Sequence, residues 1–223
     1  MKLSGAMDTR ERGPACELVA VHLAEHFGIS HSEPAAVTVH PDLAGWLAKM
    51  QPDLKGILDT SRGRNFGTRL LIDVATWPKG QEVPLAMLGK AARIFAFDAL
   101  ISNDDRRVDN PNLLVSGDDM FVIDHEAAFS FLYLIGGRTP KLDLRQRRSL
   151  TDHVFFYQLR KKAIDLGSFT ARLADLSNDQ IERIFSEVPA EWKHNNMQAI
   201  STHLQFFREN CLAFGRQLLE VLT

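Results

Sequence analysis

Carboxylate and amide side chains of the kind that accept protons and bind metal ions gather in residues 97–129. An apolar segment opens there into an acidic, asparagine-rich loop that contains Asp105 and, five positions later, Asn110. Two short β-like runs follow, and the second, 120–123, places Asp124 directly after apolar residues. This pattern indicates a site that combines a base with oxygen ligands for a divalent cation.

The spacing of these groups fits phosphoryl transfer to a hydroxyl. That reaction needs one carboxylate beside the attacking hydroxyl, and an amide oxygen and a second carboxylate that hold Mg²⁺ against the phosphates. Asp105, Asn110 and Asp124 have the order and spacing that these groups have in kinases. Asp104 could replace Asp105 as the base, but the residue five positions after Asp104 is Asp109 rather than an asparagine.

Other interpretations of the loop are open. Its acidic residues could form a solvated turn whose side chains cap their own backbone, although this leaves the apolar run before Asp124 unexplained. The spacing does not follow the EF-hand calcium loop, which requires a glutamate at its twelfth position. We expect His125 to be a structural hydrogen-bonding residue. We expect Asp98 to accept hydrogen bonds from N–H groups of the loop.

Two segments carry a family resemblance. Residues 103–114, which read NDDRRVDNPNLL, and residues 123–125, which read IDH, resemble the HipA-like kinase families. The N-x-D-R start of the first segment is also distantly similar to the type II phosphatidylinositol 4-kinases and related atypical kinases. Residues 97–101 and the triplet 65–67 look like members of the small bacterial HipA-like set as well.

The resemblance implies a role for five residues. It makes Asp105 the catalytic base, and Asn110 and Asp124 the Mg²⁺ ligands. It places Lys2 on the strand that carries the ATP-phosphate lysine and makes Glu17, on the following helix, its ion-pair partner. The alternatives without a functional role are a solvated terminal charge for Lys2 and an exposed helix charge for Glu17.

The implied fold is α+β, a protein-kinase-like arrangement of two lobes. Residues 1–75 would form a reduced N-terminal α/β lobe and hinge, and residues 76–223 a mostly helical lobe with the catalytic loop and metal-binding hairpin. Such kinases need a strand pair and a phosphate-covering loop before the lysine strand, whereas this chain begins one residue before Lys2. We therefore expect either that the true start lies upstream or that the nucleotide lobe is incomplete.

The implied activity is Mg·ATP-dependent transfer of the γ-phosphoryl group to a hydroxyl. A protein serine or threonine is the expected acceptor, and a small-molecule acceptor stays open. A nucleotide-binding pseudokinase or regulatory module without transfer is the alternative, and a metal-dependent phosphoester hydrolase is a third reading. The cofactors would be ATP and Mg²⁺. A regulatory protein is a further possible partner.

Composition narrows the class of protein. The chain has 223 residues, 45% of them hydrophobic, which is enough for a sizeable core. Its net charge of −2 gives no general attraction to nucleic acid or anionic membranes. It contains no apolar run of roughly 18 residues and no signal peptide, and Cys16 and Cys211 fall in helical apolar patterns as reduced thiols. We expect a cytoplasmic protein.

Apolar periodicity and turn residues predict the remaining elements. Strands are expected at 35–39 and 70–74, in addition to the hairpin. Pro52, Gly56 and Gly63 mark a loop, and the glycine- and arginine-rich segment 62–69 that overlaps it could touch phosphate or substrate, although surface arginines are the commoner outcome. Helices are expected at 14–27, 42–50, 85–102, 150–166, 179–188 and 197–222.

Overall fold

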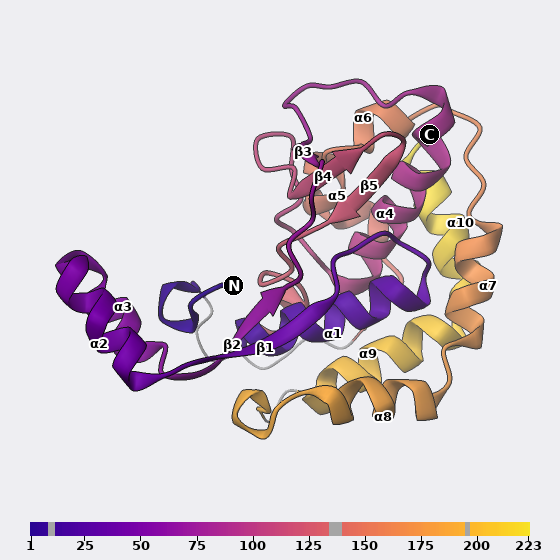
Figure 1. The fold of residues 1–223 in the computed structure, drawn as a ribbon. Coiled ribbons are helices and arrows are strands. Elements are labelled where there is room, and N and C mark those ends of the chain that lie inside the picture. The colour runs from indigo at the N-terminus through magenta and orange to yellow at the C-terminus, as the bar shows by residue number, and fades with distance from the viewer. Residues whose placement is uncertain (9–11, 134–139, 195–196) are drawn as a thin grey trace.

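The computed structural model describes residues 1–8, 12–133, 140–194 and 197–223. The protein is mixed α/β, mainly helical with two small antiparallel sheets (Figure 1). The strands are β1 Pro34–Val39, β2 Gly63–Thr68, β3 Ala75–Thr76, β4 Leu113–Ser116 and β5 Asp119–Val122. The helices are α1 Gly13–His26, α2 Pro41–Met50, α3 Lys55–Thr60, α4 Leu88–Ile101, α5 Arg148–Asp152, α6 Phe156–Leu159, α7 Gly167–Asp175, α8 Asn178–Glu187, α9 Met197–Glu209 and α10 Cys211–Val221.

The two sheets position the two ends of the site. β1 pairs with β2, and β3, β4 and β5 form a three-stranded sheet in that order. The expected hairpin is confirmed, with Leu113 opposite Val122 and a tight turn at Gly117 (φ 55°). Among the described residues, no named strand follows β5, which agrees with the expected change to helices.

Helices α1 and α4 form the centre of the main hydrophobic core. Pro14 stands in the first turn of α1, where its missing N–H costs nothing, and almost every face of this helix is buried. Phe27 at its C-terminal end lies on the ring of Phe169 at a centroid distance of 4.4 Å. The C-terminal half of α4 is fully buried, and this fixes where the acidic loop begins.

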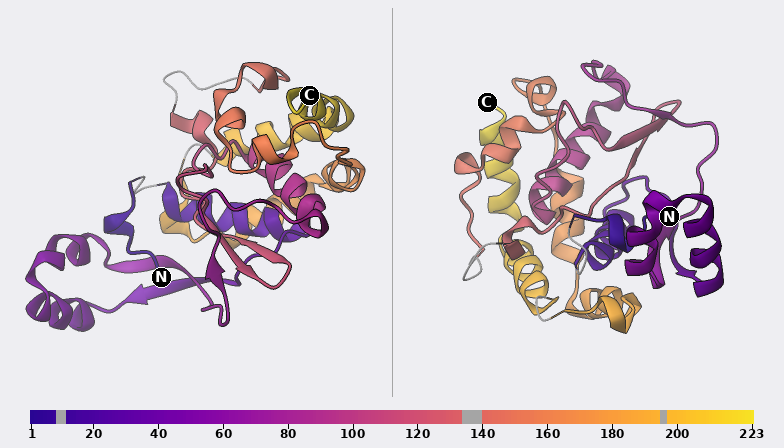
Figure 2. Two further views of the ribbon diagram at one scale, coloured as in Figure 1. Left: turned by 90° about the horizontal axis from the view of Figure 1, so that it is seen from above. Right: turned by 90° about the vertical axis from the view of Figure 1, so that its left-hand side faces the viewer.

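A helical arm interrupts the first sheet. Helices α2 and α3 join β1 to β2 and project away from the main core, as Figure 1 and the left-hand view of Figure 2 show. Three buried residues, Val39, Ala44 and Leu58, form a small separate cluster there. A short 3-10 turn at Ser4–Ala6 packs against α3, so the N-terminal segment is attached to the arm.

Two expectations for residues 52–74 are wrong. The segment 62–69, which overlaps the expected loop, contains strand β2, because pairing with β1 and burial of Asn65 and Phe66 outweigh the low strand propensity of its glycines. The segment 70–74, expected to be a strand, is irregular. Leu70 and Ile72 are exposed there, and Asp73 adopts a left-handed conformation (φ 56°).

Two predicted long helices are broken. The helix expected at 150–166 is interrupted at His153, which takes an extended conformation because its ring is drawn to Asp98 in α4. The helix expected at 197–222 divides at Asn210, whose backbone leaves the helical conformation (φ −113°) while its side chain donates to the Phe206 carbonyl at 2.8 Å. The helix expected at 179–188 is confirmed, with a capping box at Ser177.

The two cysteines are free thiols, as expected. Cys16 is fully buried in α1, and burial raises the pKa of its thiol to about 12, while Cys211 is only partly buried. Within the described ranges, every helix is too short or too polar to cross a lipid bilayer.

Candidate active site

The acidic loop begins where α4 ends. Ser102 closes the helix in a left-handed conformation (φ 50°), and its N–H bonds back to the Asp98 carbonyl. The Asn103 side chain donates to Asp98 Oδ1 at 2.8 Å. Its own oxygen accepts from the Asp105 N–H at 3.3 Å. These contacts hold the first residues of the loop against the buried end of α4. They thereby fix the position of Asp105.

Asp105 is joined to two asparagines of the same loop. Its Oδ2 accepts hydrogen bonds from Asn110 Nδ2 at 2.8 Å and from Asn112 Nδ2 at 3.1 Å. Asp105 is partly buried, whereas Asp104 is exposed. The partner five positions on therefore contacts Asp105, as the spacing predicts, and Asp104 makes no such contact among the described residues.

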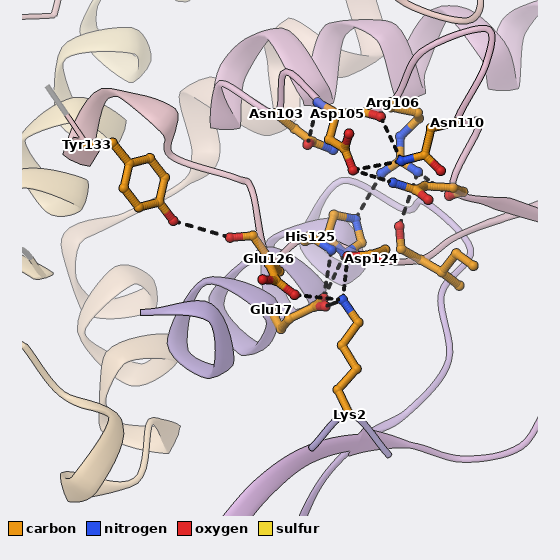
Figure 3. Close-up of polar contacts among 12 residues, drawn as sticks. Lys2, Glu17, Asn103, Asp105, Arg106, Asn110, Asp124, His125, Glu126 and Tyr133 are labelled. Carbon is orange, nitrogen blue, oxygen red and sulfur yellow. Dashed lines mark hydrogen bonds and ion pairs between the residues drawn. The ribbon is translucent and has the colours of Figure 1, made fainter. Parts of the chain in front are cut away.

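Asp124 lies at the end of the hairpin with Lys2 beside it (Figure 3). The Lys2 ammonium contacts Asp124 Oδ1, Glu17 Oε1 at 2.7 Å and Glu126 Oε2 at 3.4 Å. Asp124 has a left-handed backbone (φ 58°), which aspartate tolerates better than most residues. The Lys2 ammonium thus joins the N-terminal segment, α1 and the end of the β4–β5 hairpin.

The charges of Lys2 and Glu17 reinforce each other. Burial alone would lower the pKa of the Lys2 ammonium, but the charge of Glu17 and hydrogen bonds to Asp124 and Glu17 raise it above its ordinary value. Burial alone would raise the pKa of Glu17, yet His125 and Lys2 lower it to about 2. Both side chains are therefore charged at neutral pH, as a lysine that binds phosphate requires.

Arg106 connects the loop to the hairpin. Its guanidinium is completely buried and donates to Asp98 Oδ2 at 2.6 Å. It also donates to the carbonyl oxygens of Asn112 and, at 3.3 Å, of Ile123, the residue before Asp124. A single side chain therefore holds the residue next to Asp105 against the residue next to Asp124.

His125 and Glu17 extend this network to α1. The Arg106 guanidinium lies 3.2 Å from His125 Nε2, which therefore accepts, and His125 Nδ1 lies 3.6 Å from Glu17 Oε2. The backbone N–H of His125 donates to the same Glu17 oxygen at 2.7 Å. His125 is the structural hydrogen-bonding residue that the sequence predicted. Asp98 also supports the loop, although it does so mainly through the side chains of Asn103 and Arg106.

The predicted site residues fall into two contact groups. Lys2, Glu17 and Asp124 form one group, and Asp105 and Asn110 form the other. No hydrogen bond joins Asp124 to either member of the second group in the part of the chain that the structure describes. The two groups are connected through the buried network of Arg106 rather than directly.

Asn110 and Asp124 fit a magnesium ion whose remaining ligands come from elsewhere. The Asn110 amide directs its nitrogen to Asp105, so its oxygen points the other way, and the Asp124 side chain is 37% exposed. Among the described residues, no group of three or more histidine, cysteine, aspartate or glutamate side chains could hold a metal by itself. Mg²⁺ commonly uses one or two protein carboxylates and completes its shell with water and phosphate oxygens, so the donor set is suited to it.

A cavity of about 460 Å³ opens beside the loop. Asp104 and Arg107, which flank Asp105, contribute to its wall. The wall is completed by residues from the end of α4, from the segment after the hairpin and from α9, which are Ser102, Ser130, Phe131, Pro140, Lys141, Asp143, Gln146, Arg147, Arg148, Ser149, Asp152, His203 and Phe207. Its size suits a side chain or a small molecule rather than a folded surface.

Comparison with known proteins identifies the family. A family model described as HipA-like kinase matches residues 4–213. The chain belongs to the HipA-like kinase family. No curated protein matches it. In this HipA-like kinase the matched range includes Glu17, Asp105, Asn110 and Asp124, and it begins after Lys2.

The structure of this HipA-like kinase adds residues to which sequence reasoning gave no role. Asn112 contacts Asp105 and Glu126 contacts Lys2, while Arg106 binds Asp98 and the carbonyls of Asn112 and Ile123, and His153 binds Asp98 Oδ2 at 3.0 Å. Arg106 stands inside the motif, but an arginine in an acidic loop looks like a surface charge. Only the packing of the loop and the hairpin against the end of α4 shows that it is buried.

Proposed function

We propose that this HipA-like kinase transfers the γ-phosphoryl group of Mg·ATP to a hydroxyl, that of a serine or threonine of a protein acceptor. The observation that supports this most is the ion-paired set of Lys2, Glu17 and Asp124, joined through Arg106 to the loop that carries Asp105 and Asn110. Family membership supports phosphoryl transfer in general. The contacts within this set of residues support the specific roles that we propose for them.

Each side chain has one task in the proposed reaction. Lys2, held by Glu17, binds phosphate oxygens of ATP, and Asp124 and Asn110 supply the protein ligands of Mg²⁺. Bound Mg²⁺ would neutralise charge that develops on the phosphoryl group. Asp105 orients the acceptor hydroxyl and accepts its proton, and its hydrogen bonds to Asn110 and Asn112 keep the carboxylate in one orientation.

The proposed setting of this site is a kinase-like fold of two lobes, with residues 1–75 on the nucleotide side and 76–223 on the acceptor side. The cavity lined by Asp104 and Arg107 is the proposed place for the acceptor, because it adjoins the loop that carries the base. A cytoplasmic location, where ATP is abundant, is part of this proposal, as is a regulatory protein partner.

A second candidate function is nucleotide binding without transfer. The observation that favours it is the contact between Lys2 and Asp124, which occupies one oxygen of the proposed metal ligand. Transfer requires Asp124 to exchange this contact for the cation, whereas a regulatory module could keep it. A hydrolase that uses the same carboxylates would act on phosphoesters without nucleotide.

Incubation with labelled Mg·ATP, followed by mass spectrometry of the products, tests these functions. We expect Asp105→Asn to slow transfer by about 10²–10⁴-fold, the usual contribution of a general base. Asp124→Asn should abolish the dependence on Mg²⁺ together with transfer. Asp104→Asn is the matched control and should transfer phosphate at nearly the rate of the unaltered protein.

The outcomes separate the candidates. Equal transfer by the unaltered protein and by both the Asp105 and Asp124 variants would show that the kinase proposal is wrong. Binding of Mg·ATP without any transfer would support the regulatory module. Turnover of a phosphoester in the absence of nucleotide would support the hydrolase, and loss of transfer in Asp104→Asn alone would move the base to that residue.

A further inference from the structure

The segment that carries Lys2 is held by the side chain of Asn65. The Asn65 Oδ1 atom accepts hydrogen bonds from the backbone N–H and the hydroxyl of Ser4, at 2.8 and 2.9 Å. Its Nδ2 atom donates to the carbonyl oxygens of Ser61 and Gly63, at 2.8 and 3.1 Å. The side chain is completely buried in β2 and uses its full hydrogen-bonding capacity.

Few other interactions fix the backbone of this segment. Residues 1–3 belong to no strand, and one backbone hydrogen bond, from the Lys2 N–H to the Phe66 carbonyl at 2.8 Å, joins Lys2 to β2. The Gly5 N–H donates to the Ser61 hydroxyl at 2.8 Å. Within the described residues, Asn65 therefore accepts two hydrogen bonds from this segment, whereas the Phe66 carbonyl and the Ser61 hydroxyl accept one each.

Lys2 itself connects two parts of the molecule that have separate cores. Its neighbour Leu3 packs on the small cluster of the arm, whereas the Lys2 ammonium reaches Glu17 and Asp124, which border the main core. A lysine side chain has several rotatable bonds and loses considerable entropy when its ammonium is fixed. A fixed backbone at residues 2–4 lowers the remaining entropic cost of holding the ammonium in place.

We propose that Asn65 is a positioning residue for Lys2: by fastening Ser4 to β2, it holds the Lys2 ammonium at Glu17 and Asp124. Asn65 does not contact ATP or the reacting atoms in this role. The consequence for ATP binding rests on the proposed kinase function. The consequence for the location of Lys2 does not depend on it.

The first experiment measures where Lys2 is, without any turnover. Lysines are acylated with a limiting amount of acetic anhydride, and the rate at Lys2 is followed by mass spectrometry of peptides. In the unaltered protein Lys2 should react slowly, because its ammonium is paired with carboxylates, while exposed Lys79 reacts fast. In Asn65→Ala we expect Lys2 to react about tenfold faster, as suits the loss of hydrogen bonds to Ser4.

The matched control is Gln217→Ala. The Gln217 amide also bridges backbone groups, those of Leu142 and Leu144, but it lies in the helical part and touches no site residue. A general loss of stability would speed Lys2 acylation equally in both variants. If Asn65→Ala proves unfolded, Ser61→Ala replaces it. That variant removes the acceptor of the Gly5 N–H, together with the hydrogen bond from the Ser61 hydroxyl to the Ile57 carbonyl at 2.7 Å, but leaves the contacts of Ser4 with Asn65. It should release Lys2 to a smaller extent.

The second experiment measures the affinity for ATP. Asn65→Ala should raise the KM for ATP about tenfold with a smaller change in kcat, while Gln217→Ala leaves the KM unchanged. An unchanged Lys2 acylation rate in folded Asn65→Ala would overturn the positioning role, whatever the activity. If acylation responds but the unaltered protein neither binds nor uses ATP, the positioning role stands and the kinase function fails.

Discussion

Arg106, whose buried guanidinium carries a positive charge, is the residue on which the geometry of the site depends most. A guanidinium without solvent contact is expensive to bury, so it must be matched by a charge and by hydrogen bonds to remain in the folded state. Asp98 supplies the charge, and the carbonyls of Asn112 and Ile123 accept the remaining hydrogen bonds. Burial alone would raise the pKa of Asp98, but the charge of Arg106 and the hydrogen bond from His153 hold it well below its usual range.

Replacement of Arg106 should therefore be severe. Arg106→Met leaves Asp98 buried without its charge partner, and we expect the free energy of unfolding to fall by about 3–5 kcal/mol. Arg107→Met, the neighbouring control, removes a half-exposed arginine from surface pairs and should cost less than about 1 kcal/mol. Denaturation by urea measures both. Similar losses in the two variants would show that Arg106 is not a special residue for stability.

The sequence indicates Asp105, Asn110 and Asp124 as candidates because the proposed chemistry requires these residue types at this spacing. The contact between Asp105 and Asn110 follows from five positions within one loop, which local reasoning can predict. The roles of Arg106 and Asn65 cannot be read in this way. Arg106 depends on how the loop and the hairpin fold onto the end of α4, and Asn65 depends on a contact with Ser4, which is distant in the chain. Nothing in the local pattern distinguishes either residue from a surface residue.

At the scale of elements, tertiary contacts decide where helices end. Strong apolar periodicity correctly predicts α1, α4 and α8, and the tight turn correctly predicts the hairpin. The prediction fails at 150–166, because a side chain at His153 bonds to α4 in preference to helix continuation. It fails at 62–69 because this segment pairs with strand β1, and its glycines give no local indication of that pairing. Local propensity cannot anticipate either contact.

The joint between α9 and α4 predicts a pH dependence of stability. His203 in α9 donates through Nε2 to the Leu100 carbonyl at 2.6 Å and stacks on Phe131. Burial, with a smaller contribution from the charge of Arg147, lowers its pKa to about 4 although the hydrogen bond acts in the other direction. Between pH 6.5 and 4 the unfolded chain therefore binds a proton at this residue that the folded protein does not, and stability must fall as the pH falls.

The size of this effect should be roughly 3 kcal/mol over the full interval, at about 1.4 kcal/mol per pKa unit. Urea denaturation at pH 7 and pH 5 measures most of it. His203→Gln keeps an N–H donor but cannot titrate, so its stability should change less between the two pH values. His40→Gln removes an exposed histidine as the control. An unaltered pH slope in His203→Gln would contradict the assignment.

At the scale of the whole molecule, composition and order of elements are enough to predict a mixed fold that becomes helical after the hairpin. They do not predict the arm. Residues 41–60, which form α2, α3 and the turn between them, include Pro52, Gly56 and several exposed apolar side chains, a pattern that resembles a loop beyond one short helix. The arm exists because three apolar residues from β1, α2 and α3 meet, and such a small cluster leaves only a faint pattern in the sequence.

The small cluster predicts that the arm opens independently of the main core. With Leu58 as one of three buried residues, the arm has far less apolar burial than the core around α1 and α4, so its amides should exchange with solvent by a local opening of lower free energy. Leu58→Ala, which commonly costs about 2–5 kcal/mol at a buried site, should speed exchange in α2 and α3 while α4 keeps its rates.

Leu100→Ala, a fully buried position of the main core, is the control and should speed exchange in α4 as well. Equal acceleration of α4 by Leu58→Ala would show that arm and core unfold as one unit. Because the turn at Ser4–Ala6 packs on α3, opening of the arm should also release residues 2–5. Faster exchange at the Ser4 and Gly5 amides in Leu58→Ala would therefore show that the placement of Lys2 depends on the arm as well as on its carboxylate partners.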